Sequence, residues 1–129
     1  MKKQAIYNTW ADIVLAMLAT GGYRLEKVFQ HFELLQEYGL TDPRKISCMD
    51  PESIARNLVA SGYNRGPILT GMYTERLLSL GKLSDQAEEN ERILAEGTKE
   101  QITVLLKDIK GIGPVVIRNF LELRESYLK

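Results

Sequence analysis

Cysteine and histidine are almost absent from this sequence, and their scarcity excludes several kinds of site. The 129 residues contain one cysteine, Cys48, and one histidine, His31. A single cysteine cannot form a disulfide within the chain or supply the four thiolates of a structural zinc site or an iron–sulfur cluster. We expect Cys48 to be a small buried side chain and His31 to pack at the protein's edge. The chain must be stabilised by a hydrophobic core, for which its length is sufficient.

Long apolar runs are also missing. A membrane-spanning helix needs about 20 consecutive apolar residues, whereas the longest apolar stretch here, residues 11–19, is interrupted by Asp12. The N-terminal Met1-Lys2-Lys3-Gln4 leads into no uninterrupted apolar stretch of the kind found in secretory signals. The sequence therefore predicts a cytoplasmic protein with no membrane partner.

The chain has no overall excess of charge of either sign. Seventeen Lys and Arg residues balance seventeen Asp and Glu residues, so the formal net charge is zero. This balance argues against a polybasic membrane binder or a highly charged nucleic-acid coat protein. The charges are nevertheless segregated, with five acids and one base in residues 85–96 and six bases and four acids in residues 99–129. We expect the acidic segment to be a solvated helix face that would repel nucleic acid.

Apolar residues recur at helical spacing along the chain, and no convincing strand pattern appears. Ile6, Trp10, Ile13, Val14, Met17 and Leu18 predict a first, amphipathic helix. Further helices are expected at about 25–35, from Pro43, from Pro51 to Gly62, at 69–81, at 84–95, at 98–109 and from Pro114 to Tyr127. Residues 1–129 are thus predicted to form one all-α domain, a compact bundle of about seven or eight short helices.

The last third of the chain carries the most specific pattern, a helix-hairpin-helix at about 98–127. Thr98 and Gln101 predict a capping box at the start of the first helix. Lys110-Gly111-Ile112-Gly113 then breaks the helix and Pro114 opens the next one. The glycines permit positive φ and close approach, and the new helix presents free amides of positive partial charge. Such a turn, with Ile112 pointing inward, suits a phosphate group.

A second interpretation of the Gly-x-Gly sequence is a tight corner in which glycine serves packing alone. Two other phosphate-binding motifs are excluded. A dinucleotide-binding fold requires a preceding strand and a third glycine, and a P-loop requires Lys-Ser or Lys-Thr after the glycines. Neither is present around Gly111 and Gly113.

Three segments of the chain resemble one known family. Residues 109–114 are similar to the helix-hairpin-helix of DNA-repair proteins. Residues 60–65, Ala-Ser-Gly-Tyr-Asn-Arg, resemble the G-x-Y-x-x-K-A block of base-excision glycosylases of the endonuclease III superfamily. The helix at 10–19 and Thr20-Gly21-Gly22 resemble the start of the six-helix barrel domain in that superfamily. The resemblance covers about residues 5–125 and implies a six-helix barrel that binds DNA.

The catalytic groups of that family do not all have counterparts here. Bifunctional members use a lysine two residues after the last hairpin glycine, and that position is Val115, which cannot act as a nucleophile. The family's aspartate lies beyond the hairpin, where this sequence offers only Glu122 and Glu125 on the second hairpin helix. The family's second domain is not expected in this chain either. We therefore identify no catalytic residue and expect binding rather than base excision.

The resemblance and the charges together predict which residues contact the phosphate backbone of duplex or damaged DNA. Arg24 lies with Tyr23 in the loop where family members insert a wedge into DNA. The resemblance also implies a monovalent cation on the backbone of Ile109 and Gly111, and no other cofactor. Binding should be salt-sensitive and largely independent of sequence, which would associate the protein with the nucleoid. The predicted DNA-binding residues are Arg24, Arg65, Lys107, Lys110, Gly111, Ile112, Gly113, Pro114, Val115 and Arg118.

Two other functions stay open from the sequence. One is a divergent DNA glycosylase that releases a labile damaged base without the usual lysine and aspartate. The other is an interaction module, an inherited repair fold that binds a protein partner or forms a homodimer. Trp10, Tyr63 and Tyr73 are expected to be core residues in each case.

Overall fold

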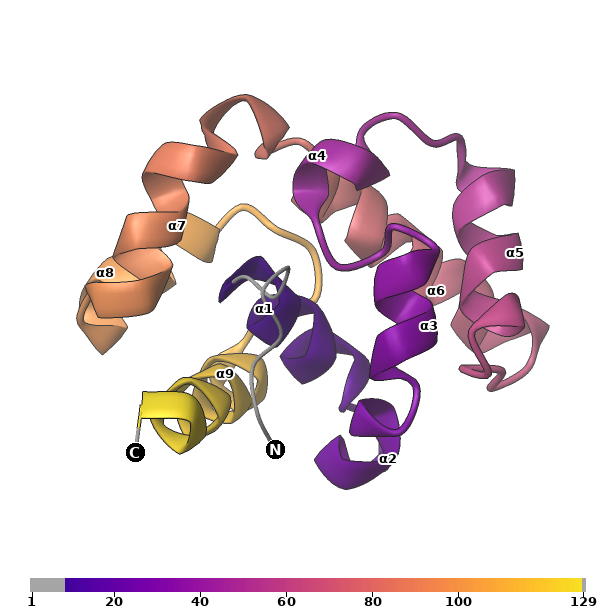
Figure 1. Ribbon diagram of the computed structural model, residues 1–129, viewed down its shortest axis with the longest axis horizontal. Coiled ribbons are helices and arrows are strands. Elements are labelled where there is room, and N and C mark those ends of the chain that lie inside the picture. Colours follow the sequence, from indigo (N-terminus) through magenta and orange to yellow (C-terminus); the bar gives the residue numbers. More distant parts are fainter. Residues whose placement is uncertain (1–8, 129) are drawn as a thin grey trace.

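The computed structural model describes the backbone of residues 9–128 and the side chains of residues 9–125. This part of the chain is all-α and contains no strand, as the apolar spacing predicted (Figure 1). Ile6 and the side chain of Tyr127 lie outside the described residues. The elements are α1 (Thr9–Leu18), α2 (Leu25–Phe29), α3 (Phe32–Glu37), α4 (Pro43–Ile46), α5 (Pro51–Ala60), α6 (Pro67–Gly81), the 3-10 helix η1 (Ser84–Gln86), α7 (Ala87–Glu96), α8 (Lys99–Leu106) and α9 (Pro114–Leu128).

Local capping fixes several helix starts where the sequence placed them. The Asp42 carboxylate accepts a hydrogen bond from the Arg44 amide at 2.9 Å, and that of Asp50 accepts one from the Ser53 amide at 2.7 Å. The predicted capping box is also present. The Gln101 amide donates to Thr98 Oγ1 at 3.1 Å, and the Thr98 amide donates to Gln101 Oε1 at 2.8 Å. These contacts satisfy amides that have no partner inside the helix.

One expected helix, at 25–35, is two helices with a turn at Gln30 and His31. The Gln30 amide bonds back to Lys27 O at 3.2 Å and ends α2. His31 then lies against Gly62, where an added Cβ would be 2.8 Å from His31 Nδ1. The turn places this imidazole on a distant part of the chain, a contact that periodicity alone does not reveal.

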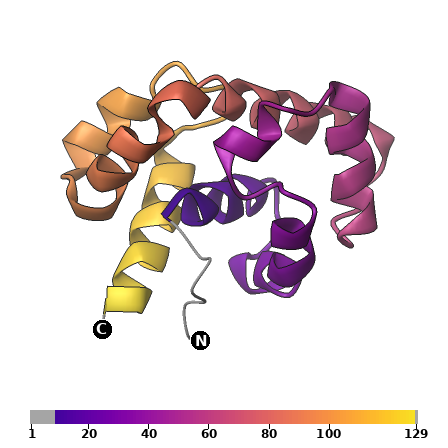
Figure 2. The same cartoon turned by 45° about the horizontal axis from the view of Figure 1, so that its top comes forward.

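Helix α1 lies at the centre of the molecule, with other helices around it (Figures 1 and 2). Every residue from Thr9 to Leu18 is buried, so the prediction of an amphipathic helix with a solvent face was wrong. A helix that is covered all round needs no polar stripe. Its Trp10 donates an indole hydrogen bond to Ala87 O at 2.9 Å, which ties the central helix to α7.

Helix α9 packs most closely on the central helix, and every other α-helix adds buried side chains to the same core, which extends to Leu123. Tyr63 and Tyr73 are buried core residues, as expected. Arg124 on α9 donates to Leu94 O at 2.9 Å and to Gly97 O at 3.0 Å, so it caps the carboxyl end of α7. Cys48 is exposed, contrary to the expectation of burial, because it lies in the turn after α4 with its thiol 3.5 Å from Arg44 O. Within residues 9–128, no helix has the length and apolar character needed to cross a bilayer.

Candidate nucleic-acid interface

Residues 107–113 join α8 to α9 through a hairpin held by its own backbone. Gly111 has φ +82°, the left-handed conformation for which glycine was predicted. The Ile109 amide donates to Leu106 O at 3.0 Å, and the Ile117 amide donates to Gly113 O at 3.1 Å. Ile109 is buried and Ile112 packs, half-buried, on the core, so Ile112 points inward as expected.

Helix α6 anchors this hairpin from outside. The Lys110 amide donates to Ser79 Oγ at 3.1 Å, and Ser79 is buried. One turn earlier on α6, Arg76 lies against Gly111, where an added Cβ would be 2.4 Å from Arg76 Cδ and Nε. The absent side chain at Gly111 therefore makes room for Arg76 as well as permitting the turn.

Several backbone amides of the hairpin have no acceptor among the residues that the structure describes. They belong to Gly111, Gly113, Val115 and Val116, the last two in the first turn of α9. The space beside Gly113 is open, since an added Cβ there would meet nothing within 4 Å. Together with the positive end of the helix dipole, these donors make a surface that favours an anion.

Three cations surround the hairpin as predicted. Lys107, Lys110 and Arg118 are exposed, and none is within salt-bridge distance of a carboxylate in the described part of the chain. Pro114 and Val115 are exposed on the same turn, Val115 at 47%. Asp108 is exposed there too and offsets part of the positive charge. The structure thus brings all eight predicted hairpin residues, Lys107, Lys110, Gly111, Ile112, Gly113, Pro114, Val115 and Arg118, into one short segment.

A pocket of about 410 Å³ lies between α8 and the start of α9. Lys99 and Thr103 line it, and neither was singled out in the sequence, although Lys99, Thr103 and Lys107 share one helix face at four-residue spacing. The Thr103 hydroxyl donates to Lys99 O at 2.8 Å. The lining residues are Lys99, Thr103, Leu106, Lys107, Ile112, Gly113, Pro114 and Ile117.

The predicted DNA contact Arg65 has a different role in the structure. Its guanidinium donates to Thr20 O at 2.8 Å and to Gly21 O at 2.6 Å. It also donates to the hydroxyls of Tyr63 and Tyr73, each at 3.1 Å. A guanidinium with so many protein acceptors fastens the 20–24 loop to the start of α6. We therefore leave Arg65 out of the interface.

The aromatic residues around Arg65 close this loop further. Tyr23 packs on the Tyr63 ring with centroids 4.9 Å apart, and its hydroxyl lies 3.0 Å from His31 Nε2. Burial raises the pKa of the Tyr63 hydroxyl well above its usual value, so it remains protonated and donates to Leu18 O at 2.5 Å. Tyr23 therefore points into the protein, and Arg24 is the exposed side chain of the loop.

The loop and the hairpin are neighbours. Asn119, next to Arg118 on α9, donates to Ala19 O at 3.3 Å. A second connection runs through Tyr73, whose hydroxyl lies 2.6 Å from Thr20 Oγ1 and whose ring lies 5.2 Å from Arg76 Cζ. Arg24 also lines a polar pocket of about 410 Å³ with Gly22, Tyr23, Glu26, Lys27 and Gln30.

The two carbonyls expected to hold a monovalent cation differ in their bonding. That of Gly111 accepts no hydrogen bond from the described residues, whereas that of Ile109 accepts a long one, 3.4 Å from the Ile112 amide. Both are oxygen donors of the kind that a hard cation binds, and cation binding there stays a prediction. No group of three or more His, Cys, Asp or Glu side chains that could hold a metal occurs within residues 9–128.

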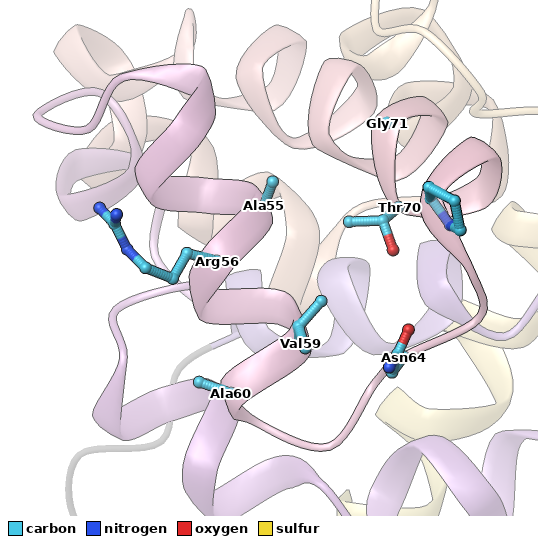
Figure 3. A pocket seen from close by; sticks show the side chains of 8 residues that line it. Ala55, Arg56, Val59, Ala60, Asn64, Thr70 and Gly71 are labelled. Carbon is cyan, nitrogen blue, oxygen red and sulfur yellow. The ribbon is translucent and has the colours of Figure 1, made fainter.

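A different kind of surface lies between α5 and α6. A pocket of about 720 Å³ is lined there by Ala55, Arg56, Val59, Ala60, Asn64, Pro67, Thr70 and Gly71. In Figure 3, Ala55 and Val59 face Thr70 across this pocket, and Arg56 points away from it. Next to it in the chain, Ile68 is 86% exposed.

Comparisons of the chain with protein-family models, with curated proteins and with solved structures found no match.

Proposed function

We propose that this protein is a DNA-binding domain of the helix-hairpin-helix kind, similar to the six-helix barrel of endonuclease III-like glycosylases. It holds the phosphate backbone of duplex or damaged DNA. The observation that carries the proposal is a set of hairpin amides without acceptors in the described part of the chain, together with three exposed cations on the same segment that have no ion-pair partner there.

Phosphate recognition by this hairpin uses two kinds of donor. The amides of Gly113, Val115 and Val116 donate to phosphate oxygens, and the missing Cβ at Gly113 lets the phosphate approach the backbone. Lys107, Lys110 and Arg118 add charge at the rim. A monovalent cation on Ile109 and Gly111 would supply further positive charge beside the phosphate.

Backbone recognition of this kind carries little sequence information, since phosphates are the same at every base pair. It also explains why zero net charge is compatible with DNA binding, because amides supply part of the attraction. Val115 stands where the resemblance places a Schiff-base lysine, so the proposal is for binding without base excision.

The substitution Gly113→Arg tests the proposal. Gly113 has open space around it and no positive φ, so the variant should fold while the new side chain covers the amides. Gly71→Arg is the matched control, because Gly71 is equally open and lies on the α5–α6 face. Fluorescence anisotropy with a labelled duplex, measured over a salt series, should show binding lost for Gly113→Arg and kept for Gly71→Arg. Equal binding by both variants would contradict the proposal.

The apolar pocket between α5 and α6, with Ile68 beside it, favours a second candidate function as a protein-interaction module. That function predicts self-association or partner binding that Ile68→Asp removes. Sedimentation velocity of the wild-type and Ile68→Asp proteins, alongside DNA titrations at low salt, distinguishes an interaction module from a DNA-binding domain. A wild-type protein that self-associates and binds no DNA would select the second function.

A further inference from the structure

Arg76 belongs to α6 and not to the hairpin motif, but its side chain lies directly on the hairpin. Its side chain covers the α-carbon of Gly111, since an added Cβ would be 2.4 Å from both Cδ and Nε and 2.9 Å from Cζ. Ser79, three residues later and therefore on the same helix face, accepts the Lys110 amide at 3.1 Å. Helix α6 thus presents an anchor and a guanidinium side by side to consecutive residues of the hairpin.

The guanidinium of Arg76 is held without being neutralised. Its Cζ lies 5.2 Å from the Tyr73 ring centroid, a cation–π contact that restricts where the head group points. Within the described part of the chain, Arg76 donates no hydrogen bond and pairs with no carboxylate. Arg76 is half-buried, and its donors are left for solvent or for a ligand.

Arg65 shows what a structural arginine looks like in this protein. It also lies over Tyr73, at 5.6 Å, but it donates to two backbone carbonyls and two tyrosine hydroxyls. A half-buried guanidinium that served packing alone would be expected to find similar acceptors, because unmade hydrogen bonds are costly. Arg76 has the position of a packing residue and the free donors of a binding residue.

We infer that Arg76 is a phosphate-binding residue and that the phosphate site is built jointly by α6 and the hairpin. This inference rests on the proposed function and names a ligand that the hairpin motif does not contain. Arginine suits the role because its planar fork can donate two hydrogen bonds to one phosphate and can stack on a ring at the same time. Gly111 is then required for two reasons, the turn and the passage of Arg76 to the ligand.

The test compares Arg76→Gln with Arg56→Gln in duplex-DNA titrations over a salt series. Arg56 is an exposed arginine on α5, at the opposite side of the molecule from α8 (Figure 1). Loss of one phosphate contact should weaken binding roughly tenfold at low salt and reduce the slope of log K against log salt by about 0.9. Arg56→Gln should change neither quantity. Arg76→Lys should keep the slope but bind more weakly than wild type, because it retains the charge and loses the fork.

An unchanged affinity and slope for Arg76→Gln, with binding lost in Gly113→Arg, would overturn this inference and leave the proposed function standing. A wild-type protein that binds no duplex would overturn both. Should Arg76→Gln fail to fold, the wild-type protein still gives an answer by NMR. The Arg76 Nε–H signal should shift when duplex is added, and a signal that stays in place while those of Gly113 and Val115 move would refute the role of Arg76.

Discussion

Arg65 and Arg76 make the same kind of contact with one aromatic ring, but they differ in their hydrogen bonds. Both guanidiniums lie over Tyr73, at 5.6 and 5.2 Å. Around Arg65 the 20–24 loop turns its carbonyls inward, and every contact is made within the protein. Around Arg76, within the described residues, the guanidinium donates no hydrogen bond, and the amides of Gly111 and Gly113 have no acceptor. An arginine's role in this protein therefore depends on whether the backbone beside it presents oxygens or N–H groups to it.

The largest difference between the two regions should appear when the hairpin loses its charge. Replacing Lys107, Lys110 and Arg118 with glutamine should reduce the salt slope of duplex binding by about 2.7, at about 0.9 for each phosphate contact. Because the three side chains are exposed and lack ion pairs, the melting temperature should hardly change. Anisotropy titrations and thermal unfolding measure the two quantities. A large loss of stability would show that these three residues stabilise the fold, as Arg65 does.

Removing Arg65 should have the reverse effect. In Arg65→Ala the Gly21 carbonyl loses its donor and the Thr20 carbonyl loses its shortest one, and the free energy of unfolding should fall by about 2–3 kcal/mol. In Arg76→Ala the free energy of unfolding should fall by only about 0.5 kcal/mol, the usual range for a side chain without such partners. Urea denaturation of both variants makes the comparison. If Arg76→Ala is the less stable protein, the division between the two regions is wrong.

The two hairpin glycines offer a sharper contrast within one region. Gly111→Ala should destabilise the protein by about 1–2 kcal/mol, because φ is +82° and the new methyl group meets Arg76. Gly113→Ala should be nearly neutral for stability, since its surroundings are open. Urea denaturation measures both, and duplex binding should weaken in both. Equal stabilities would show that the hairpin adjusts more easily than its geometry indicates.

The smallest expected effect concerns His31, whose ring lies beside Tyr23 in the aromatic cluster around Arg65. Burial, and after it the nearby Lys27 ammonium, lowers the pKa of the His31 imidazole below 6.5. The folded state therefore favours the neutral ring, and the stability it contributes is complete above the unfolded value and is lost as pH falls through 6.5 toward the lowered pKa. Urea denaturation at several pH values should show a small decline that His31→Gln removes. A decline of the same size in His31→Gln would assign it to other groups.

The local elements of this fold were predictable because their causes are local. Asp42-Pro43 and Asp50-Pro51 start helices through carboxylates that accept amides two or three residues away. The Thr98–Gln101 box works over the same distance. The hairpin glycines were equally visible, since the turn depends on the residues that form it. For this reason the positive φ of Gly111 and the new helix start at Pro114 could be predicted, whereas DNA binding by this segment stays a prediction.

Features that depend on distant residues were missed or misjudged. The sequence around His31 does not predict the break between α2 and α3, nor that the imidazole lies against Gly62, about 30 residues away in the chain. The burial of α1 on all sides depends on where α7, α9 and the other helices pack. Cys48 was expected inside and is exposed, because short turns leave little room for burial.

The residue pattern alone is enough to predict an all-α chain, the start and end signals of most helices, and a glycine hairpin followed by a new helix start. Which arginine makes hydrogen bonds within the protein depends instead on the tertiary structure. Arg65 reaches Thr20 and Gly21, while Arg76 reaches Gly111. The physical reason is that a guanidinium's hydrogen bonds depend on the acceptors that packing brings to it, and those acceptors lie on segments remote in the chain.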